Sequence, residues 1–276
     1  TSAPSSSSTS SGGGGGGGVT LNKTEQAIDF SLGKELYETT IVLDRLKNDS
    51  ISITNNEKTE KTFKIEILVI NDIISFDNKN IKFAPGETKT LEFRVHAPEK
   101  PGIYAGKIIV SSGTTKKEIF VTINVKTEKN LFDITLTIPK FMKVINVGET
   151  FYIQLDLLQM GLKEKADVTL NYIIKDFNGG VYFTESETIA VTDQKTLRKE
   201  FETKDLPPGD YVIGTELVYA DGVAVSSSNF KIKERLSLGK EQIIMIGLIL
   251  LIVLVSVIIL LAIKRYKKLE SQLIIE

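Results

Sequence analysis

The sequence predicts an all-β protein with two tandem antiparallel β-sandwiches, followed by one C-terminal transmembrane helix. Three observations support this fold class. Residues 25–127 and 131–234 alternate between apolar and polar side chains, pairs of turn-forming residues separate the alternating runs, and residues 243–263 carry no charge. Strand side chains point alternately to opposite faces of a sheet, so a period of two indicates half-buried strands. A membrane helix needs about 20 successive apolar residues.

Composition excludes several classes of function. The 276 residues include 34 Lys and Arg against 35 Asp and Glu, giving a net charge of −1. Nucleic-acid binding requires clustered cations, so we expect no nucleic-acid partner. The chain has no cysteine, which removes disulfides, thiolate metal sites and cysteine nucleophiles. We expect no cofactor.

The first predicted sandwich covers residues 25–127, after a Ser- and Gly-rich segment, 1–24, that we expect to be a disordered linker. Its clearest strands are residues 63–69, 91–95 and 119–125. In the last of these, alternation predicts that Val121 and Ile123 are buried, and that Thr122 and Asn124 are more exposed.

The second predicted sandwich covers residues 131–234 and begins after the polar run 127–130. Its alternating runs are residues 132–138, 151–157 and 168–174. The pairs Asn178-Gly179 and Asp221-Gly222 predict hairpins, with both central residues of a type I′ turn at positive φ. The serines at 226, 227 and 228 are interpreted as a solvent-facing row near a sheet edge.

A weak internal repeat links the two segments. Residues 90–104 (TLEFRVHAPEKPGIY) match residues 196–211 (TLRKEFETKDLPPGDY), which are one residue longer. In both, a strand leads to a Pro-Gly turn and then to a tyrosine, Tyr104 or Tyr211, that opens the penultimate strand. We expect each tyrosine to form a structural corner with its hydroxyl bonded to backbone. Two copies of one corner predict two copies of one fold.

Residues 83–113 resemble the NEW-type Ig-like domains associated with alpha-galactosidases. The resemblance is carried by Pro85-Gly86-Glu87, the strand 91–95 and the corner 98–104. Residues 131–233 are similar to CARDB-type Ig-like domains, and the combination with a C-terminal helix resembles uncharacterised archaeal or bacterial membrane-anchored surface proteins. The resemblance implies Ig-like folds. Its motifs specify a fold and no activity.

The predicted transmembrane helix, 242–264, has an asymmetric charge distribution. Lys264, Arg265, Tyr266, Lys267 and Lys268 follow it and are expected to be anchors at the membrane interface, whereas the charges before it cancel. By the positive-inside rule, the tail 265–276 is cytoplasmic and both sandwiches are extracellular. We therefore expect a single-pass protein of the plasma membrane, with membrane lipid as one partner.

The small residues of this helix favour a simple anchor. Gly247 and Ser256 are nine positions apart, which places them on opposite faces at about 100° per residue. A helix that packs closely against another usually gathers its small residues on one face.

Candidate catalytic and metal-binding groups are few. His96 is the single histidine, and its position on the polar face of a strand favours a surface residue over a catalytic base. Asp176 and Asn178 have the spacing of calcium ligands, but the following residues continue as a strand. Glu185 and Glu187 share one strand face, which we interpret as solvated. We expect no catalytic and no metal-binding residue.

Two sequons, at Asn22 and Asn48, are candidate N-glycosylation sites. Asn22 lies in the expected flexible entry, and Asn48 in an expected turn. Both positions would be accessible to modification on an outward-facing domain.

The leading functional hypothesis is a non-catalytic cell-surface protein, an Ig-like stalk or adhesion module with a protein or glycan partner outside the cell. Two alternatives remain. The chain could be a subunit of a larger envelope assembly, such as secretion, pilus or S-layer machinery, or it could carry the accessory domains of an upstream surface enzyme. A packing helix would favour the assembly, and catalytic sequence upstream would favour the enzyme.

Overall fold

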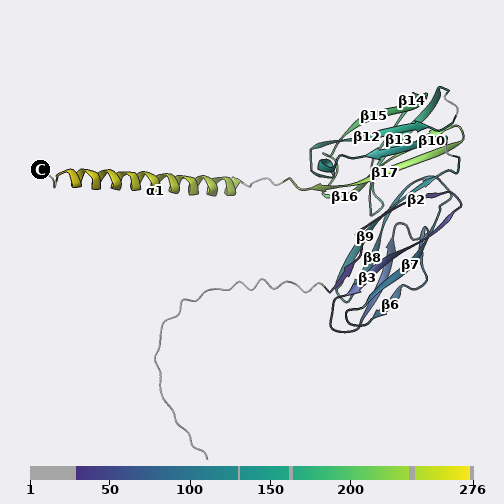
Figure 1. The fold of residues 1–276 in the computed structure, drawn as a ribbon, viewed down its shortest axis with the longest axis horizontal. Coiled ribbons are helices and arrows are strands. Elements are labelled where there is room, and N and C mark those ends of the chain that lie inside the picture. The colour runs from purple at the N-terminus through teal and green to yellow at the C-terminus, as the bar shows by residue number, and fades with distance from the viewer. Residues whose placement is uncertain (1–28, 130, 162–163, 236–239, 274–276) are drawn as a thin grey trace, which may run out of the picture.

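The computed structural model describes residues 29–129, 131–161, 164–235 and 240–273 (Figure 1). The predicted fold class is confirmed: two β-sandwiches precede one C-terminal helix. The linker predicted at 1–24 lies outside the described residues.

The first sandwich pairs a four-stranded with a five-stranded sheet. The smaller sheet has the order β1 (Phe30–Leu32), β3 (Leu46–Asn55), β7 (Thr88–His96) and β5 (Ile74–Phe76). The larger sheet has the order β2 (Leu36–Val42), β9 (Thr115–Lys126), β8 (Gly102–Ser112), β4 (Lys61–Leu68) and β6 (Asn80–Phe83). The β2–β9 pair is parallel, whereas the other pairs are antiparallel.

The second sandwich repeats this topology, except that its smaller sheet has no counterpart of β5 among the described residues. Its smaller sheet has the order β10 (Phe132–Thr137), β12 (Thr150–Gln159) and β15 (Gln194–Glu202). Its larger sheet has the order β11 (Val144–Asn146), β17 (Gly222–Lys233), β16 (Gly209–Tyr219), β13 (Ala166–Asp176) and β14 (Val181–Val191). The parallel β11–β17 pair corresponds to β2–β9, and a 3₁₀ turn, η1 (Lys140–Met142), precedes it.

Each sandwich has its own apolar core between its two sheets. Phe30, Phe63 and Phe93 are fully buried in the first, and Phe151 and Tyr172 in the second. These residues lie on the inward faces that alternation predicts.

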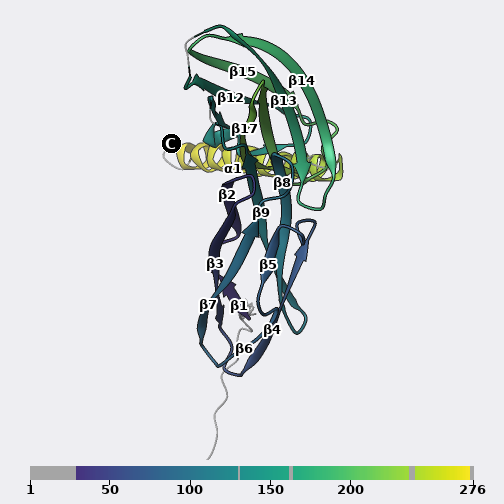
Figure 2. The same ribbon diagram turned by 90° about the vertical axis from the view of Figure 1, so that its right-hand side faces the viewer.

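Alternation fails on β9, where Thr122 is as buried as Val121 and Ile123. The prediction that Thr122 is exposed is wrong because the outer face of β9 is covered by the second sandwich. β9 and β8 meet the second sandwich beside β17 in both ribbon views (Figures 1 and 2). The two larger sheets therefore pack outer face to outer face.

Two turns also differ from expectation. The Asn178-Gly179 hairpin closes through a four-residue loop between Asp176 and Val181, and only Gly179 has positive φ, +95°. In the other hairpin, Gly222 already pairs with Tyr219, so the turn falls one residue earlier than predicted. The Asn-Gly and Asp-Gly pairs mark both hairpins correctly but not the type I′ geometry.

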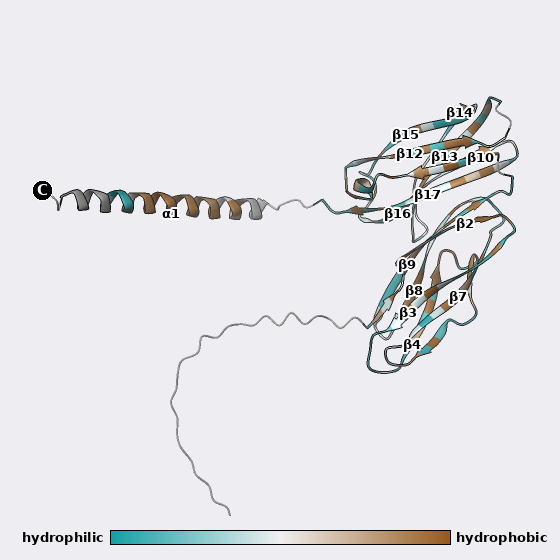
Figure 3. Ribbon diagram, viewed as in Figure 1, coloured by the Kyte–Doolittle hydropathy of each residue, from teal (hydrophilic) through white to brown (hydrophobic). Residues whose placement is uncertain are grey.

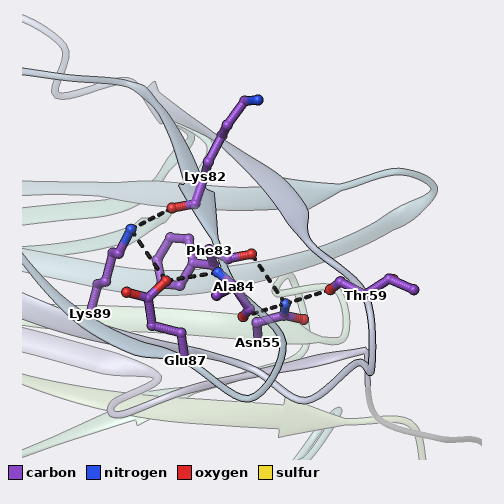
Figure 4. Close-up of polar contacts among 7 residues, drawn as sticks. All are labelled: Asn55, Thr59, Lys82, Phe83, Ala84, Glu87 and Lys89. Carbon is purple, nitrogen blue, oxygen red and sulfur yellow. Dashed lines mark hydrogen bonds and ion pairs between the residues drawn. The ribbon is translucent and has the colours of Figure 1, made fainter.

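A buried asparagine organises the tip of the first sandwich (Figure 4). Asn55 is fully buried, and its amide donates to the carbonyls of Thr59 (2.9 Å) and Ala84 (2.9 Å). Glu87 accepts from the Ala84 N–H (2.8 Å) and thereby closes the turn at Pro85 and Gly86, where Gly86 has φ +69°. The Pro-Gly-Glu motif thus has a structural role at this tip.

Helix α1 (Lys240–Leu273) extends beyond the apolar run into the predicted tail. Residues 265–273 of the tail are therefore helical rather than irregular. A helix that is already formed adds further residues without a new nucleation cost, which accounts for the extension. Residues 274–276 lie outside the described residues.

Candidate functional site

The described part of the chain contains one helix long and apolar enough to cross a membrane. The candidate span Ile244–Arg265 is 22 residues long and contains an 18-residue window with a mean hydropathy of 3.5. Its residues are coloured as hydrophobic almost throughout (Figure 3). Lys264 and Arg265 lie exposed at its end. The side chains of Tyr266, Lys267 and Lys268 lie outside the described residues. The Ser256 hydroxyl donates to the Ile252 carbonyl of the same helix at 2.8 Å.

The interface between the two larger sheets, which we call the joint, has a small apolar centre. Its buried members are Ile103, Ala105, Phe177, Val212 and Val225. Apart from Phe177, which lies in the loop after β13, they come from β8, β16 and β17.

Ile103 packs closely against the second sandwich. It is 1% exposed and packs over the backbone of Gly214. A Cβ on Gly214 would overlap Cδ1 of Ile103 and lie 2.9 Å from its Cγ1. Only glycine leaves room for the isoleucine here.

Two charged groups of the second sandwich bind the backbone of the same residue. Lys175 donates to the Ile103 carbonyl at 2.7 Å, and the Ile103 N–H hydrogen-bonds the Glu216 carboxylate. Burial lowers the pKa of Lys175 and raises the pKa of Glu216, and their mutual attraction opposes both shifts. The two charges compensate each other at a partly buried site.

Polar contacts extend the joint along β9 and β17. Thr122 donates to the Asn229 side chain at 3.1 Å, and Ser227 donates to Asn124 at 2.8 Å. The Thr127 N–H donates to the Val223 carbonyl at 3.1 Å. Residue numbers rise on β9 as they fall on β17, so the two strands run antiparallel across the joint.

A crevice opens at the edge of the joint. Two adjoining hollows of about 250 and 270 Å³ share the lining residues Phe120, Phe177, Asp210 and Tyr211. The rings of Phe120 and Phe177 lie 4.8 Å apart. Ligand pockets usually exceed about 300 Å³, so each hollow alone is small for a ligand.

Tyr104 and Tyr211 occupy equivalent positions, each the third residue of its penultimate strand. The Tyr104 hydroxyl donates to the Lys100 carbonyl at 2.8 Å, and the Tyr211 hydroxyl donates to the Pro207 carbonyl at 2.6 Å. Both acceptors lie four residues upstream. Burial raises the pKa of Tyr211 to about 12, so this hydroxyl remains a donor at neutral pH.

His96 lies within hydrogen-bond distance of one serine. Its Nε2 is 3.0 Å from Ser75 Oγ, and its backbone N–H donates to the Ile73 carbonyl at 2.8 Å. A catalytic triad requires a carboxylate that hydrogen-bonds the other ring nitrogen. In the described part of the chain, no carboxylate makes this contact with His96. The adjacent hollow, which Ser75 lines, measures about 80 Å³. The contact joins β5 to β7.

The candidate carboxylates are occupied by structural contacts. Asp176 accepts from the N–H groups of Asn178 (2.8 Å) and Gly180 (2.7 Å), which holds its own hairpin loop closed. Lys199 lies 2.6 Å from Glu185 and 3.7 Å from Glu187. The glutamates share a face, as their spacing predicts, and one lysine neutralises part of their charge.

The remaining sequence-predicted residues lie as follows. Asn22 falls outside the described residues. Asn48 is exposed, but it lies in β3 rather than in a turn. The serines pair with β16 alone, because β11 reaches β17 only at residues 231–233, so they lie near an edge as expected; they are half-buried rather than solvent-facing. Ser226 accepts from the Leu136 N–H (2.9 Å), and Ser228 accepts from Lys143 (2.5 Å).

Sequence reasoning missed the joint, although a signal was present. The strands that form it carry few charges on either face, as in GIYAGKIIVSS of β8 and GDYVIGTELVY of β16. A strand that is apolar on both faces is covered on both faces.

No known protein family and no curated protein matches the chain. Among solved structures, it is similar to a protein of unknown function from Porphyromonas gingivalis W83, with 10% identity, 75% of this chain and 100% of that chain covered, and a TM-score of 0.38. It is also similar to a CARDB domain from Pyrococcus furiosus, solved in complex with di-metal ions, with 13% identity, coverage of 38% and 94%, and a TM-score of 0.29. A PapD-like domain of human CEP192 has 6% identity, coverage of 43% and 100%, and a TM-score of 0.34. At these scores the similarities carry no argument about family or function.

Proposed function

We propose that this chain is a non-catalytic, membrane-anchored surface protein, whose two sandwiches act together as one interaction module outside the cell. The observation that carries this proposal is the architecture itself: a paired all-β module ends in a single apolar helix. Such a helix would fix the module at a membrane, and the four cations that follow the apolar run support a cytoplasmic C-terminus.

The joint supports a compact module over an extended stalk. Tandem domains that only space something apart need few contacts between them, whereas here Ile103 is buried against the second sandwich and its backbone is bound by two charged side chains. A partner, protein or glycan, would therefore meet two sandwiches in a defined arrangement, with the crevice beside Phe120 and Phe177 between them.

Protease treatment of intact cells tests the orientation. Added protease should remove the region before about residue 236 and spare a fragment that contains α1 and the C-terminus. Cleavage of the C-terminus with protection of the sandwiches would reverse the proposed topology. Cross-linking on the same cells, followed by mass spectrometry, would identify the extracellular partner.

Replacement of Gly247 and Ser256 by leucine tests whether the helix only anchors. The Ser256 hydroxyl is bonded within its own helix, and the two residues lie on opposite faces, so the double variant should keep its surface display and partner binding. Loss of partner binding with normal membrane insertion would instead favour a subunit of an envelope assembly.

A further inference from the structure

The second sandwich presents an exposed aromatic side chain in the turn before β11. Phe141, in η1, is 74% exposed, the highest value among the large hydrophobic side chains described. Val144, three residues later, is 47% exposed. A phenylalanine with so little packing inside its own domain contributes nothing to the core. Its apolar surface is available to a partner outside the sandwich.

This turn lies near the point where the chain leaves for the membrane. Val144 pairs with Lys231 and Asn146 with Lys233, the last residue of β17. Figure 1 shows the short 3₁₀ turn at the end of the second sandwich from which the chain continues towards α1. Because this pair is parallel, the turn precedes β11 and the chain leaves after β17, so the turn lies about the length of β11, roughly 10 Å, from the exit.

The connection between this end and the helix is short. Helix α1 begins at Lys240, and the seven steps from Lys233 span at most about 25 Å when fully extended. Four helical residues then add about 6 Å before the apolar span begins at Ile244. Such a tether holds the turn at a high effective concentration over the headgroups, so a weak contact is enough to be populated.

Exposed charges of both signs lie near the turn. Lys140, Lys233 and Arg235 are exposed, and so are Glu149 and Glu234. Lys231 is also exposed, although it pairs with Asp210 at 3.0 Å. An exposed aromatic side chain next to a lysine, Lys140, can insert at the level of the headgroups while the ammonium group stays among the lipid phosphates.

We propose that the turn 140–144 docks on the membrane surface, with Phe141 inserted between the lipid headgroups. This inference rests on the proposed anchoring by α1. The docked turn gives the module a second membrane contact and orients the end of the second sandwich towards the bilayer.

The chain has no tryptophan, so the full-length Phe141→Trp variant carries a single reporter. It is reconstituted in vesicles of phosphatidylcholine with phosphatidylglycerol, with and without lipids brominated high on the acyl chains. We expect the emission to shift to shorter wavelength, and the brominated lipid to remove more than half of its intensity. The control is Leu158→Trp, because Leu158 is 44% exposed near the opposite end of β12 and should be neither shifted nor quenched.

The outcomes separate the docking from the anchor. Flotation of the vesicles reports insertion of α1 independently of the reporter. If the protein floats but Trp at 141 emits like Trp at 158, docking is refuted and the anchor stands. If the emission shifts without quenching by brominated lipid, the side chain contacts protein and the lipid assignment is wrong. If the protein does not float, both proposals fail.

Discussion

Exchanging volume across the joint tests whether Ile103 and Gly214 hold the two sandwiches together. Ile103→Ala removes three carbons from the first sandwich, and Gly214→Val adds three to the second. Each single change should weaken the joint, the first by leaving a cavity and the second by the overlap with Ile103. The double variant should recover much of what each single variant loses.

The magnitudes follow from the burial. Ile103 is 1% exposed, and truncation of such a side chain to alanine costs about 2–5 kcal/mol. Gly214→Val should cost about 1–3 kcal/mol through overpacking, because the neighbouring Ser226 carbonyl, 3.4 Å from the new Cβ, limits relaxation. Because the added group fills the space that the truncation vacates, we expect a favourable coupling of at least about 1 kcal/mol.

Distances between spin labels read out the arrangement of the sandwiches. The chain has no native cysteine, so cysteines at Glu92 and Glu200, both exposed and on the two smaller sheets, are the sole attachment sites. In the detergent-solubilised full chain, the distance distribution should broaden for each single variant and narrow again for the double variant. Urea unfolding of the same samples gives the free energies.

Ile109 supplies the matched control. It lies on the same face of β8 as Ile103, but it is only partly buried and is not a member of the joint. Ile109→Ala should therefore fail to rescue Gly214→Val. An unchanged distance distribution for Gly214→Val, or effects of Ile103→Ala and Gly214→Val that simply add, would show that the described joint does not hold the sandwiches in solution.

Three further changes test other parts of the structure. Thr122→Asp should cost about 3 kcal/mol or more in urea unfolding, because it buries a charge against Asn229, and an effect as small as that of a surface substitution would contradict the covered face. Asn55→Ala should lower the free energy of unfolding by about 3 kcal/mol, since three side-chain hydrogen bonds of good geometry are lost; wild-type stability would refute this role. The raised pKa of Glu216 means that its protonation favours the folded state, so this contribution is complete below the ordinary glutamate value of 4.5 and is lost as pH rises through the folded-state pKa. As pH falls from 7 to below 4.5, the melting temperature of the wild type should gain this contribution, and Glu216→Gln should reduce the gain. An unaltered pH profile in the variant would show that Glu216 is not its source.

Local patterns predicted most of what lies within each sandwich. The alternation at 119–125 correctly placed Val121 and Ile123 in the core, and the Pro-Gly-Tyr repeat located corresponding points of two equivalent topologies. These features depend on residues close together in the chain, where the strand period and turn chemistry act directly.

Strand period and turn chemistry could not predict the contacts between the two sandwiches. Thr122 and Ser227 have side chains that suit water as well as a polar interface, so residue type alone does not say which they meet. The neighbours of Gly214 in the chain do not explain why a glycine stands there, because the side chain that needs the space, Ile103, belongs to the other sandwich. A period of two reports which residues share a face, and it leaves open what covers that face.

The packing of Ile103 over Gly214 has a consequence for sequence divergence. The two positions lie in different domains, yet a side chain at one is tolerated only where the other is small. Among relatives that keep this joint, a residue larger than glycine at the position of Gly214 should occur together with alanine or glycine at the position of Ile103. A relative that has both large residues must join its two sandwiches in another way.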